Sequence, residues 1–287
     1  MAELATALLP WMVGLMMAAF GATTPANAFR HVIRQPTPLL LAACVPLLVA
    51  PSAAQVIAAA FDLPPQSRAA IVLVAACPAG ALTSLWVMLA RGRVPQALAT
   101  TLLTTALCGF TIPIHLRLAG LELDASLFGM VGKMLTLTAL PLLAGVILSQ
   151  LAPRVRPFAG KAKSASAVGI IALFAVLIAA AWPDVSAAWA QASNAVVALN
   201  AVLAALGLFA ATMFREPEVR RALFPAFVTR QEEIGLFVAL SIVGSAAMAA
   251  PLLVNALIGT GLALVFAGAC RLRDQSHTKT KIVEGAE

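Results

Sequence analysis

The sequence predicts an all-α membrane protein that crosses the bilayer nine times. Of its 287 residues, 61% are hydrophobic and only 11% are charged, whereas a soluble globular domain is roughly a quarter charged. So few charges cannot cover a water-facing surface of this size. The apolar runs are continuous, and the sequence contains no Tyr. Both features argue against an outer-membrane β-barrel, whose strands alternate polar and apolar residues between aromatic girdles.

Nine apolar stretches define the expected helices, since one crossing needs ~20 apolar residues. Proline, glycine and charged residues separate the stretches, as at 61–65 and 90–93. The segment 271–287 follows the last stretch, and its polar, mixed-charge composition predicts a disordered cytoplasmic tail. The nine stretches lie at residues 4–23, 37–60, 69–90, 95–118, 126–150, 164–182, 186–213, 221–246 and 251–270.

The basic residues predict how the chain lies in the membrane. If the N-terminus is outside, most of the 19 Lys and Arg residues fall on one side of the bilayer. Loops rich in Lys and Arg stay in the cytoplasm, so we expect an inner-membrane protein with its N-terminus outside and its C-terminus cytoplasmic. Basic residues divided among short loops also argue against a nucleic-acid partner. The residues expected on the cytoplasmic side are Arg30, Arg34, Arg91, Arg93, Arg154, Arg156, Lys161, Lys163, Arg215, Arg220, Arg221, Arg271, Arg273, Lys279 and Lys281.

The sequence lacks the residues that an intramembrane enzyme needs. Its three histidines, His31, His115 and His277, are expected in loops or in the tail, and no Asp falls within an apolar stretch. A metalloprotease needs His ligands beside a carboxylate, an aspartyl protease needs two membrane Asp, and a serine protease needs a membrane Ser–His pair. We therefore expect no enzymatic activity.

One charged cluster interrupts the apolar stretches. Arg230, Glu232 and Glu233 flank Gln231 within stretch 221–246. Each charge at the bilayer centre costs at least ~2.5–3.5 kcal/mol, so these side chains must face protein or water. Two interpretations remain open. The cluster is either a cation or substrate site, or a structural feature: an Arg230–Glu233 pair at i,i+3 on a helix, or a helix end at the cytoplasmic surface.

A second irregularity lies in stretch 69–90. Pro78 removes a backbone donor, Gly80 loosens the same turn, and Thr83 and Ser84 supply hydroxyl groups just beyond it. A helix broken here frees carbonyl groups and a positive half-helix N-terminus near the middle of the membrane. An ordinary proline kink is the alternative.

The two irregular stretches predict an internal repeat. They lie five stretches apart and run in opposite directions, as expected for five-helix inverted repeats whose broken helices cross at a central site. The first, truncated repeat and the opening helix of the second occupy residues 1–150, and the rest of the second repeat occupies 151–270. The first repeat lacks its opening helix, which gives the odd number of helices.

Several short segments together resemble the bile acid:sodium symporter family. One is the glycine- and methionine-rich segment Leu9-Pro10-Trp11-Met12-Val13-Gly14-Leu15-Met16-Met17. The family signature Cys-Pro-Gly-Gly, Ser-Asn and Leu-Ala-x-Gly is similar to Cys77-Pro78-Ala79-Gly80, Thr83-Ser84 and Leu89-Ala90-Arg91-Gly92. The threonine-rich run Thr100-Thr101-Leu102-Leu103-Thr104-Thr105 and the segment Gly132-Lys133-Met134 with Pro141-Leu142 follow at the family's spacing.

The resemblance implies a transporter of ten helices, of which the first has no counterpart here. A mobile core would contain stretches two to four and seven to nine, and a supporting panel would contain stretches one, five and six. Family members carry organic anions, usually with sodium. The family's sodium ligands fall on Thr83, Ser84 and Thr101, but also on Ala97 and Pro46, which offer no side-chain oxygen.

The family motif Glu-x-Gly-x-Gln-Asn has no clean match in the eighth stretch, where Glu232 and Glu233 supply the acidic oxygens. Two adjacent carboxylates make proton coupling an alternative to sodium coupling. We therefore expect a secondary active transporter of a small organic anion, with Na⁺ or H⁺ as the coupling ion and no other cofactor. The alternative is a transporter-derived membrane sensor or scaffold that binds a ligand without moving it.

Oligomeric state is not predicted, because Ala-rich helices offer small-xxx-small patterns throughout.

The predicted site consists of ten residues. The predicted groups are Glu232, Glu233, Thr83, Ser84 and Thr101 for ion or proton coupling, Arg230, Gln231 and Asn194 for substrate or charge pairing, and Pro78 and Gly80 for the helix break.

Overall fold

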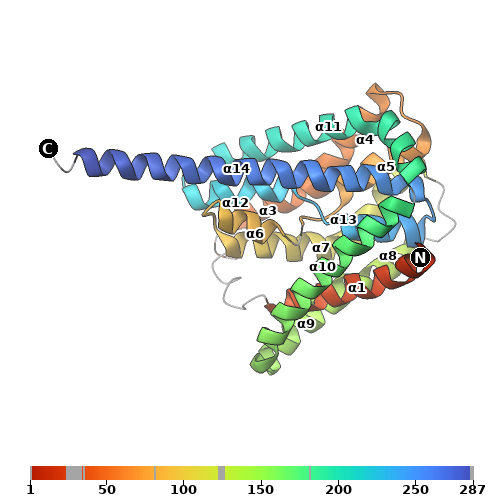
Figure 1. Ribbon diagram of the computed structural model, residues 1–287, viewed down its shortest axis with the longest axis horizontal. Helices are drawn as coiled ribbons and strands as arrows, with labels where there is room; N and C mark the ends of the chain where they lie inside the picture. The colour runs from red at the N-terminus through yellow and green to blue at the C-terminus, as the bar shows by residue number, and fades with distance from the viewer. Residues whose placement is uncertain are drawn as a thin grey trace.

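The computed structural model describes residues 2–23, 34, 36–80, 82–121, 127–180 and 182–284, which form an all-helical bundle (Figure 1). Within these residues the only β-type pairing is an isolated antiparallel bridge between Ala79 and Arg230. Arg30 and His31 lie outside the described residues. The all-α prediction is confirmed in this part of the chain.

Each predicted apolar stretch falls on one helix or on a run of consecutive helices. Five segments of the described chain are long and apolar enough to cross a membrane: 36–60, 94–118, 131–151, 192–212 and 249–276. The α-helices are α1 (Ala2–Thr23), α3 (Pro36–Cys44), α4 (Ala50–Ala60), α5 (Pro65–Ala76), α6 (Thr83–Leu89), α7 (Val94–Leu118), α8 (Leu127–Leu137), α9 (Ala139–Leu151), α10 (Arg156–Ala180), α11 (Trp182–Thr212), α12 (Pro217–Val228), α13 (Glu232–Phe237) and α14 (Ala249–Glu284). Short π or 3₁₀ turns lie at η1 (Val45–Val49), η2 (Pro153–Val155), η3 (Val238–Ile242) and η4 (Ala246–Met248).

The helices form two packed groups. The largest contacts of α1 are with α9 and α10, while α11, α12, α14, α4 and α5 pack among themselves. Figure 1 shows α1, α8, α9 and α10 together along one side of the molecule, beside the larger group. These four helices carry the predicted stretches one, five and six.

Pro51 explains why the second stretch is not one regular α-helix. Pro51 has no N–H to donate to the carbonyl of Leu47, and the preceding segment widens into the π turn η1. The Nε2 of His115 in α7 donates to this carbonyl oxygen at 3.0 Å. The expectation that His115 lies in a loop is therefore wrong: it is buried in the last turns of α7, where it satisfies a backbone acceptor.

The polar C-terminal segment also differs from its prediction. Instead of being disordered from residue 271, the chain continues α14 to Glu284, which extends away from the bundle in Figure 1. Tertiary contacts hold the start of this extension: Arg271 Nε donates to the carbonyl of Leu89 at 2.8 Å, and Arg221 NH1 donates to Asp274 at 3.0 Å. Composition alone could not reveal these partners.

Close backbone packing joins α1 to α9. A Cβ added to Gly145 would collide with the carbonyl oxygen of Ala18, and one added to Gly21 would collide with that of Leu142. We predict that Gly145→Ala lowers the free energy of unfolding by about 1–3 kcal/mol through overpacking. The readout is the unfolding temperature of the purified protein in detergent.

Gly160→Ala in α10 is the matched control, because a Cβ at Gly160 meets nothing within 4 Å. Alanine is the better helix former, so this variant should unfold at the same or a slightly higher temperature. Equal unfolding temperatures for both variants would contradict the close α1–α9 contact.

Candidate functional site

Two helix breaks face each other in the middle of the bundle. The first separates α5 from α6: Pro78 forces Cys77 into an extended conformation (φ −58°, ψ 143°), which ends α5 at Ala76. The second separates α12 from α13, where Thr229 is also extended (φ −98°, ψ 134°). The helix break predicted at Pro78 is present.

The backbones of the two breaks pair with each other. The N–H of Gln231 donates to the carbonyl of Pro78 at 2.9 Å, and the N–H of Gly80 donates to the carbonyl of Thr229 at 3.2 Å. Buried backbone N–H and C=O groups need hydrogen-bond partners. Here each break supplies partners for the backbone groups of the other break. We call the described residues 77–80 and 82, together with 229–231, the crossing.

Threonine hydroxyl groups complete the hydrogen bonding of the crossing. Thr83 Oγ1 lies 2.6 Å from Thr229 Oγ1. From α7, Thr101 Oγ1 donates to the carbonyl of Gly80 at 3.3 Å, and Thr104 Oγ1 accepts from the N–H of Ala79 at 3.1 Å. The structure therefore brings the predicted residues Thr83 and Thr101 to the crossing.

Gln231 connects the crossing to both groups of helices. Its Oε1 accepts a hydrogen bond from Thr105 Oγ1 of α7 at 2.8 Å, and its Nε2 lies 3.9 Å from the sulfur of Met17 in α1. Ser84 is half-buried in the first turn of α6. Asn194, in contrast, is exposed on α11, and the structure does not bring it to the crossing.

The predicted charged cluster is buried at the crossing. Arg230, Glu232 and Glu233 are 3%, 8% and 8% exposed. Arg230 precedes the first residue of α13, so the i,i+3 helical spacing to Glu233 does not apply. The three guanidinium nitrogens of Arg230 have no hydrogen-bond partner among the described residues. The same is true of Oε1 of Glu233. The described chain thus contains no Arg230–Glu233 pair.

Two asparagines reach this site that the predicted set omits. Asn255 of α14 donates from Nδ2 to Oε1 of Glu232 at 2.9 Å. Asn200 of α11 donates from Nδ2 to Oδ1 of Asn255, also at 2.9 Å. The one available signal for Asn255 was an amide inside the otherwise apolar stretch 251–270.

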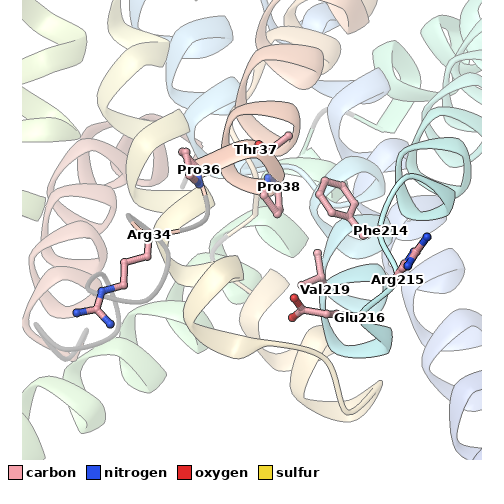
Figure 2. Close-up of a pocket in the computed structure, with 8 residues that line it drawn as sticks. All are labelled: Arg34, Pro36, Thr37, Pro38, Phe214, Arg215, Glu216 and Val219. Carbon is pink, nitrogen blue, oxygen red and sulfur yellow. The ribbon is translucent and has the colours of Figure 1, made fainter.

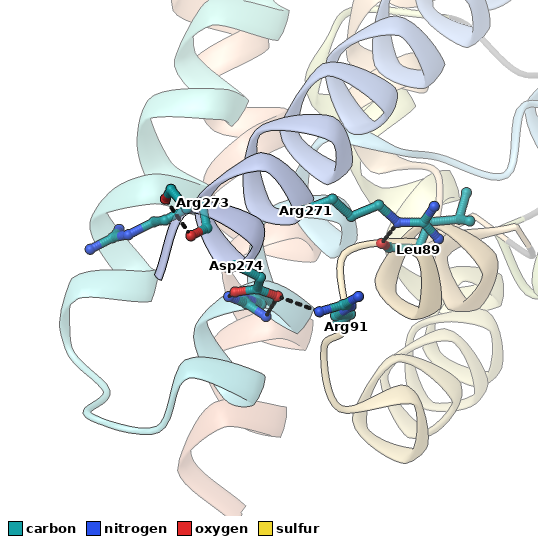
Figure 3. A network of polar contacts seen from close by, with 7 residues as sticks. Leu89, Arg91, Arg271, Arg273 and Asp274 are labelled. Atoms are coloured by element: carbon teal, nitrogen blue, oxygen red, sulfur yellow. Dashed lines mark hydrogen bonds and ion pairs between the residues drawn. The ribbon is translucent and has the colours of Figure 1, made fainter. Parts of the chain in front are cut away.

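Ion pairs gather at the far end of α12 from the crossing. Asp274 accepts from Arg221 and from Arg91, the latter at 3.3 Å (Figure 3). Arg93 pairs with Glu216. These contacts join α14, the start of α12 and the segment after α6, three regions that all carry residues predicted to be cytoplasmic. We call this region the basic end.

A cavity of about 390 Å³ also lies at the basic end, between the start of α3 and the connection from α11 to α12 (Figure 2). Its lining includes Arg34, Pro38, Phe214 and Glu216. The length of α12 separates it from the crossing, so this cavity is not the predicted site.

Comparison with known sequences identifies the family. A sequence model described as the Sodium Bile acid symporter family matches residues 10–192. The chain belongs to this family. The predicted family is therefore confirmed, and the match includes α1 from residue 10 onward, the first break and the threonines of α7. The residues of the second break lie beyond it.

Two curated relatives of this chain are transporters by name. The chain is 25% identical over 171 residues to "Uncharacterized sodium-dependent transporter YocS" of Bacillus subtilis (strain 168), covering 58% of this chain and 52% of that protein. It is 27% identical over 165 residues to "Probable sodium/metabolite cotransporter BASS1, chloroplastic" of Arabidopsis thaliana, covering 56% and 41%. The aligned part thus spans about half of these relatives or less.

Family membership and the apolar helices make this a multi-pass membrane protein, and Na⁺ as a coupling ion fits a family of sodium symporters. Among the described residues, no group of three or more His, Cys, Asp or Glu could hold a metal ion. Sodium binds a different set of groups, namely oxygen atoms, and hydroxyl and carbonyl oxygens lie in the crossing while the carboxylates of Glu232 and Glu233 follow it directly.

The crossing itself can be tested through Gly80. A Cβ at this position would lie 2.9 Å from the carbonyl oxygen of Arg230, so one of the two breaks must shift. We predict that Gly80→Ala lowers the unfolding temperature in detergent by several degrees. Gly261→Ala in α14, where a Cβ meets nothing within 4 Å, should not lower it, and a matching decrease there would remove the support for tight packing at Gly80.

Proposed function

We propose that this protein is a secondary active transporter that carries a small organic anion across the inner membrane, coupled to sodium, by alternating access. One observation carries the proposal: the guanidinium of Arg230 is buried at the crossing of two broken helices and has no hydrogen-bond partner among the described residues. A buried, unpaired charge is strongly destabilising. An anionic substrate offsets this cost, and a carboxylate can accept two parallel hydrogen bonds from an arginine.

Charge balance supports coupling between the substrate and a cation. Arg230, Glu232 and Glu233 together carry a formal charge of −1 when both carboxylates are ionised. An organic anion adds a second negative charge, and a sodium ion compensates for it. Because opposite charges attract more strongly in a low dielectric, each ligand increases the affinity of the site for the other.

Oxygen atoms from several elements would hold the sodium ion. In our proposal Glu232 and Glu233 provide carboxylate oxygens, while Thr83, Ser84 and Thr101 provide hydroxyl oxygens. Gln231 has a separate role: it contacts α7 and approaches Met17 of α1. Substrate bound beside Gln231 would therefore lie where the two groups of helices meet.

Alternating access requires the two groups of helices to move against each other. We propose that α1, α8, α9 and α10 form the panel and that the remaining helices form the core. The antiparallel pairing at the crossing supports two inverted repeats, which place one broken helix in each half. The basic end supports a cytoplasmic location for the segments near Arg91, Arg215 and Asp274, with nine crossings and the N-terminus outside.

The proposed function predicts that sodium stabilises the protein, which can be tested without a known substrate. The unfolding temperature of the purified protein should be higher in sodium than in equal potassium or choline. An ion that binds only the native state adds about 2.7 kcal/mol at a hundredfold excess over its Kd. Glu232→Gln should abolish this difference, because it removes a charged ligand.

Glu218→Gln is the control, since Glu218 is exposed in the first turn of α12 and should leave the sodium effect intact. A stability that depends on pH and not on sodium, and that Glu232→Gln abolishes, would replace sodium by a proton in this proposal. Dependence on neither ion would exclude ion coupling at this site.

The proposed function also predicts that the protein transports a small carboxylate together with sodium. In proteoliposomes with an inward sodium gradient, a panel of small carboxylates should include a substrate that accumulates. Arg230→Gln should weaken binding of that substrate about ten- to hundredfold, the equivalent of one lost charged hydrogen bond of ~1.5–3 kcal/mol. Its sodium-dependent stabilisation should remain.

Arg220→Gln, at an exposed position of the basic end, should leave binding unchanged. Unaltered affinity in Arg230→Gln would remove this residue from the substrate site. Ligand binding without flux in the wild-type protein would favour the alternative function, a membrane sensor derived from a transporter.

A further inference from the structure

A chain of three buried polar side chains connects α11, through α14, to α13. Asn200 and Asn255 are 1% and 0% exposed. Asn200 Nδ2 donates both to the backbone carbonyl of Val196 and to Oδ1 of Asn255, each at 2.9 Å. Asn255 Nδ2 then donates to Oε1 of Glu232 at 2.9 Å. The three side chains come from three different helices, so the contact is not a consequence of local sequence.

The carbonyl of Val196, at one end of the chain of polar side chains, determines the direction of these hydrogen bonds. The carbonyl of Val196 can only accept, so the amide of Asn200 must turn its Nδ2 toward that carbonyl. The second hydrogen of this Nδ2 goes to Oδ1 of Asn255. With its Oδ1 occupied in this way, Asn255 presents its Nδ2 to Glu232.

The unsatisfied atom in the chain supports this orientation. Asn200 Oδ1 is buried and has no hydrogen-bond partner among the described residues, which costs free energy. Turning the amide over would break two hydrogen bonds and place oxygen against oxygen at Val196. The unpaired Oδ1 is therefore the consequence of a fixed donor direction toward Glu232.

We infer that Asn200 and Asn255 are positioning residues for the cation site: they hold the carboxylate of Glu232 in the geometry that binds the coupling ion. This inference rests on the proposed function. Asn255 acts by direct contact, and Asn200 acts only through Asn255. Without Asn200, Oδ1 of Asn255 loses its donor and the Asn255 amide is free to turn its oxygen toward Glu232, which repels the carboxylate.

The test measures the sodium concentration that gives half of the maximal increase in unfolding temperature. Asn255→Leu and Asn200→Leu should each raise this concentration about tenfold, the effect of losing one hydrogen bond to a charged group. The double variant should need the same sodium concentration as Asn255→Leu alone, because both substitutions remove the same interaction. Substrate affinity at saturating sodium should stay within about twofold.

Thr212→Leu is the control: it also replaces a polar side chain by leucine on α11, at an exposed position away from the crossing, and it should leave the sodium concentration unchanged. Asn200→Ser is the second variant, a smaller and polar change to be used if Asn200→Leu does not fold. It should also raise the sodium concentration, because one hydroxyl cannot replace two amide N–H donors.

The outcomes separate this inference from the proposed function. No sodium effect in the wild-type protein contradicts the proposed function itself. A sodium effect that is unchanged in Asn200→Leu or Asn200→Ser overturns the positioning role and leaves the proposed function standing. Additive effects in the double variant also overturn it, because Asn200 would then act by a route that does not include Asn255.

Discussion

The structure depends on the backbone pairing between its two broken helices. Within an apolar bundle an unpaired N–H or C=O group costs several kcal/mol, so neither break is stable alone. The hydrogen bonds from Gln231 to Pro78 and from Gly80 to Thr229 remove this cost from both at once. Every functional side chain in our proposal is anchored within a few residues of these bonds or packs against them.

The pairing also explains how three ionisable residues remain inside the bundle. An α-helix that continued through 229–231 would distribute these side chains around its circumference. The break instead places Arg230 on an extended segment, and Glu232 and Glu233 in the first turn of a new helix. The helix N-terminus favours negative charge there, and Asn255 supplies a donor to Glu232. Of these three residues, Arg230 and Glu233 keep buried polar atoms that have no hydrogen-bond partner among the described residues, and we assign both groups to ligands.

Different interactions hold the helices together within each of the two groups. The glycine contact of α1 with α9 brings backbone against backbone, which suits a rigid support. The larger group is held by hydrogen bonds among buried threonine, asparagine and glutamine side chains, and by ion pairs at the basic end. Between the groups, α1 approaches the crossing at Gln231 through a sulfur atom, a weak acceptor. Apolar side chains make up the rest of this interface, where α7 packs against α8 and both groups share one buried core.

The sequence by itself determined the features that are local. Long apolar runs predict helices because each backbone group must be paired within its own segment, and Pro78 ends α5 because it lacks an N–H and restricts Cys77. The buried charges were recognisable for the same reason, since charge in an apolar run needs protein partners. The family, too, could be identified from short motifs.

Only the tertiary structure decided which polar residues meet. Asn194 and Asn200 lie six positions apart on α11, which separates them by about 120° around the helix axis at 100° per residue. Their surroundings differ because neighbouring helices cover one side of α11, and composition does not specify that side. Asn255, His115 and the extension of α14 were missed for a related reason. Each is stabilised by a partner distant in the sequence, and such partners exist only after the chain has folded.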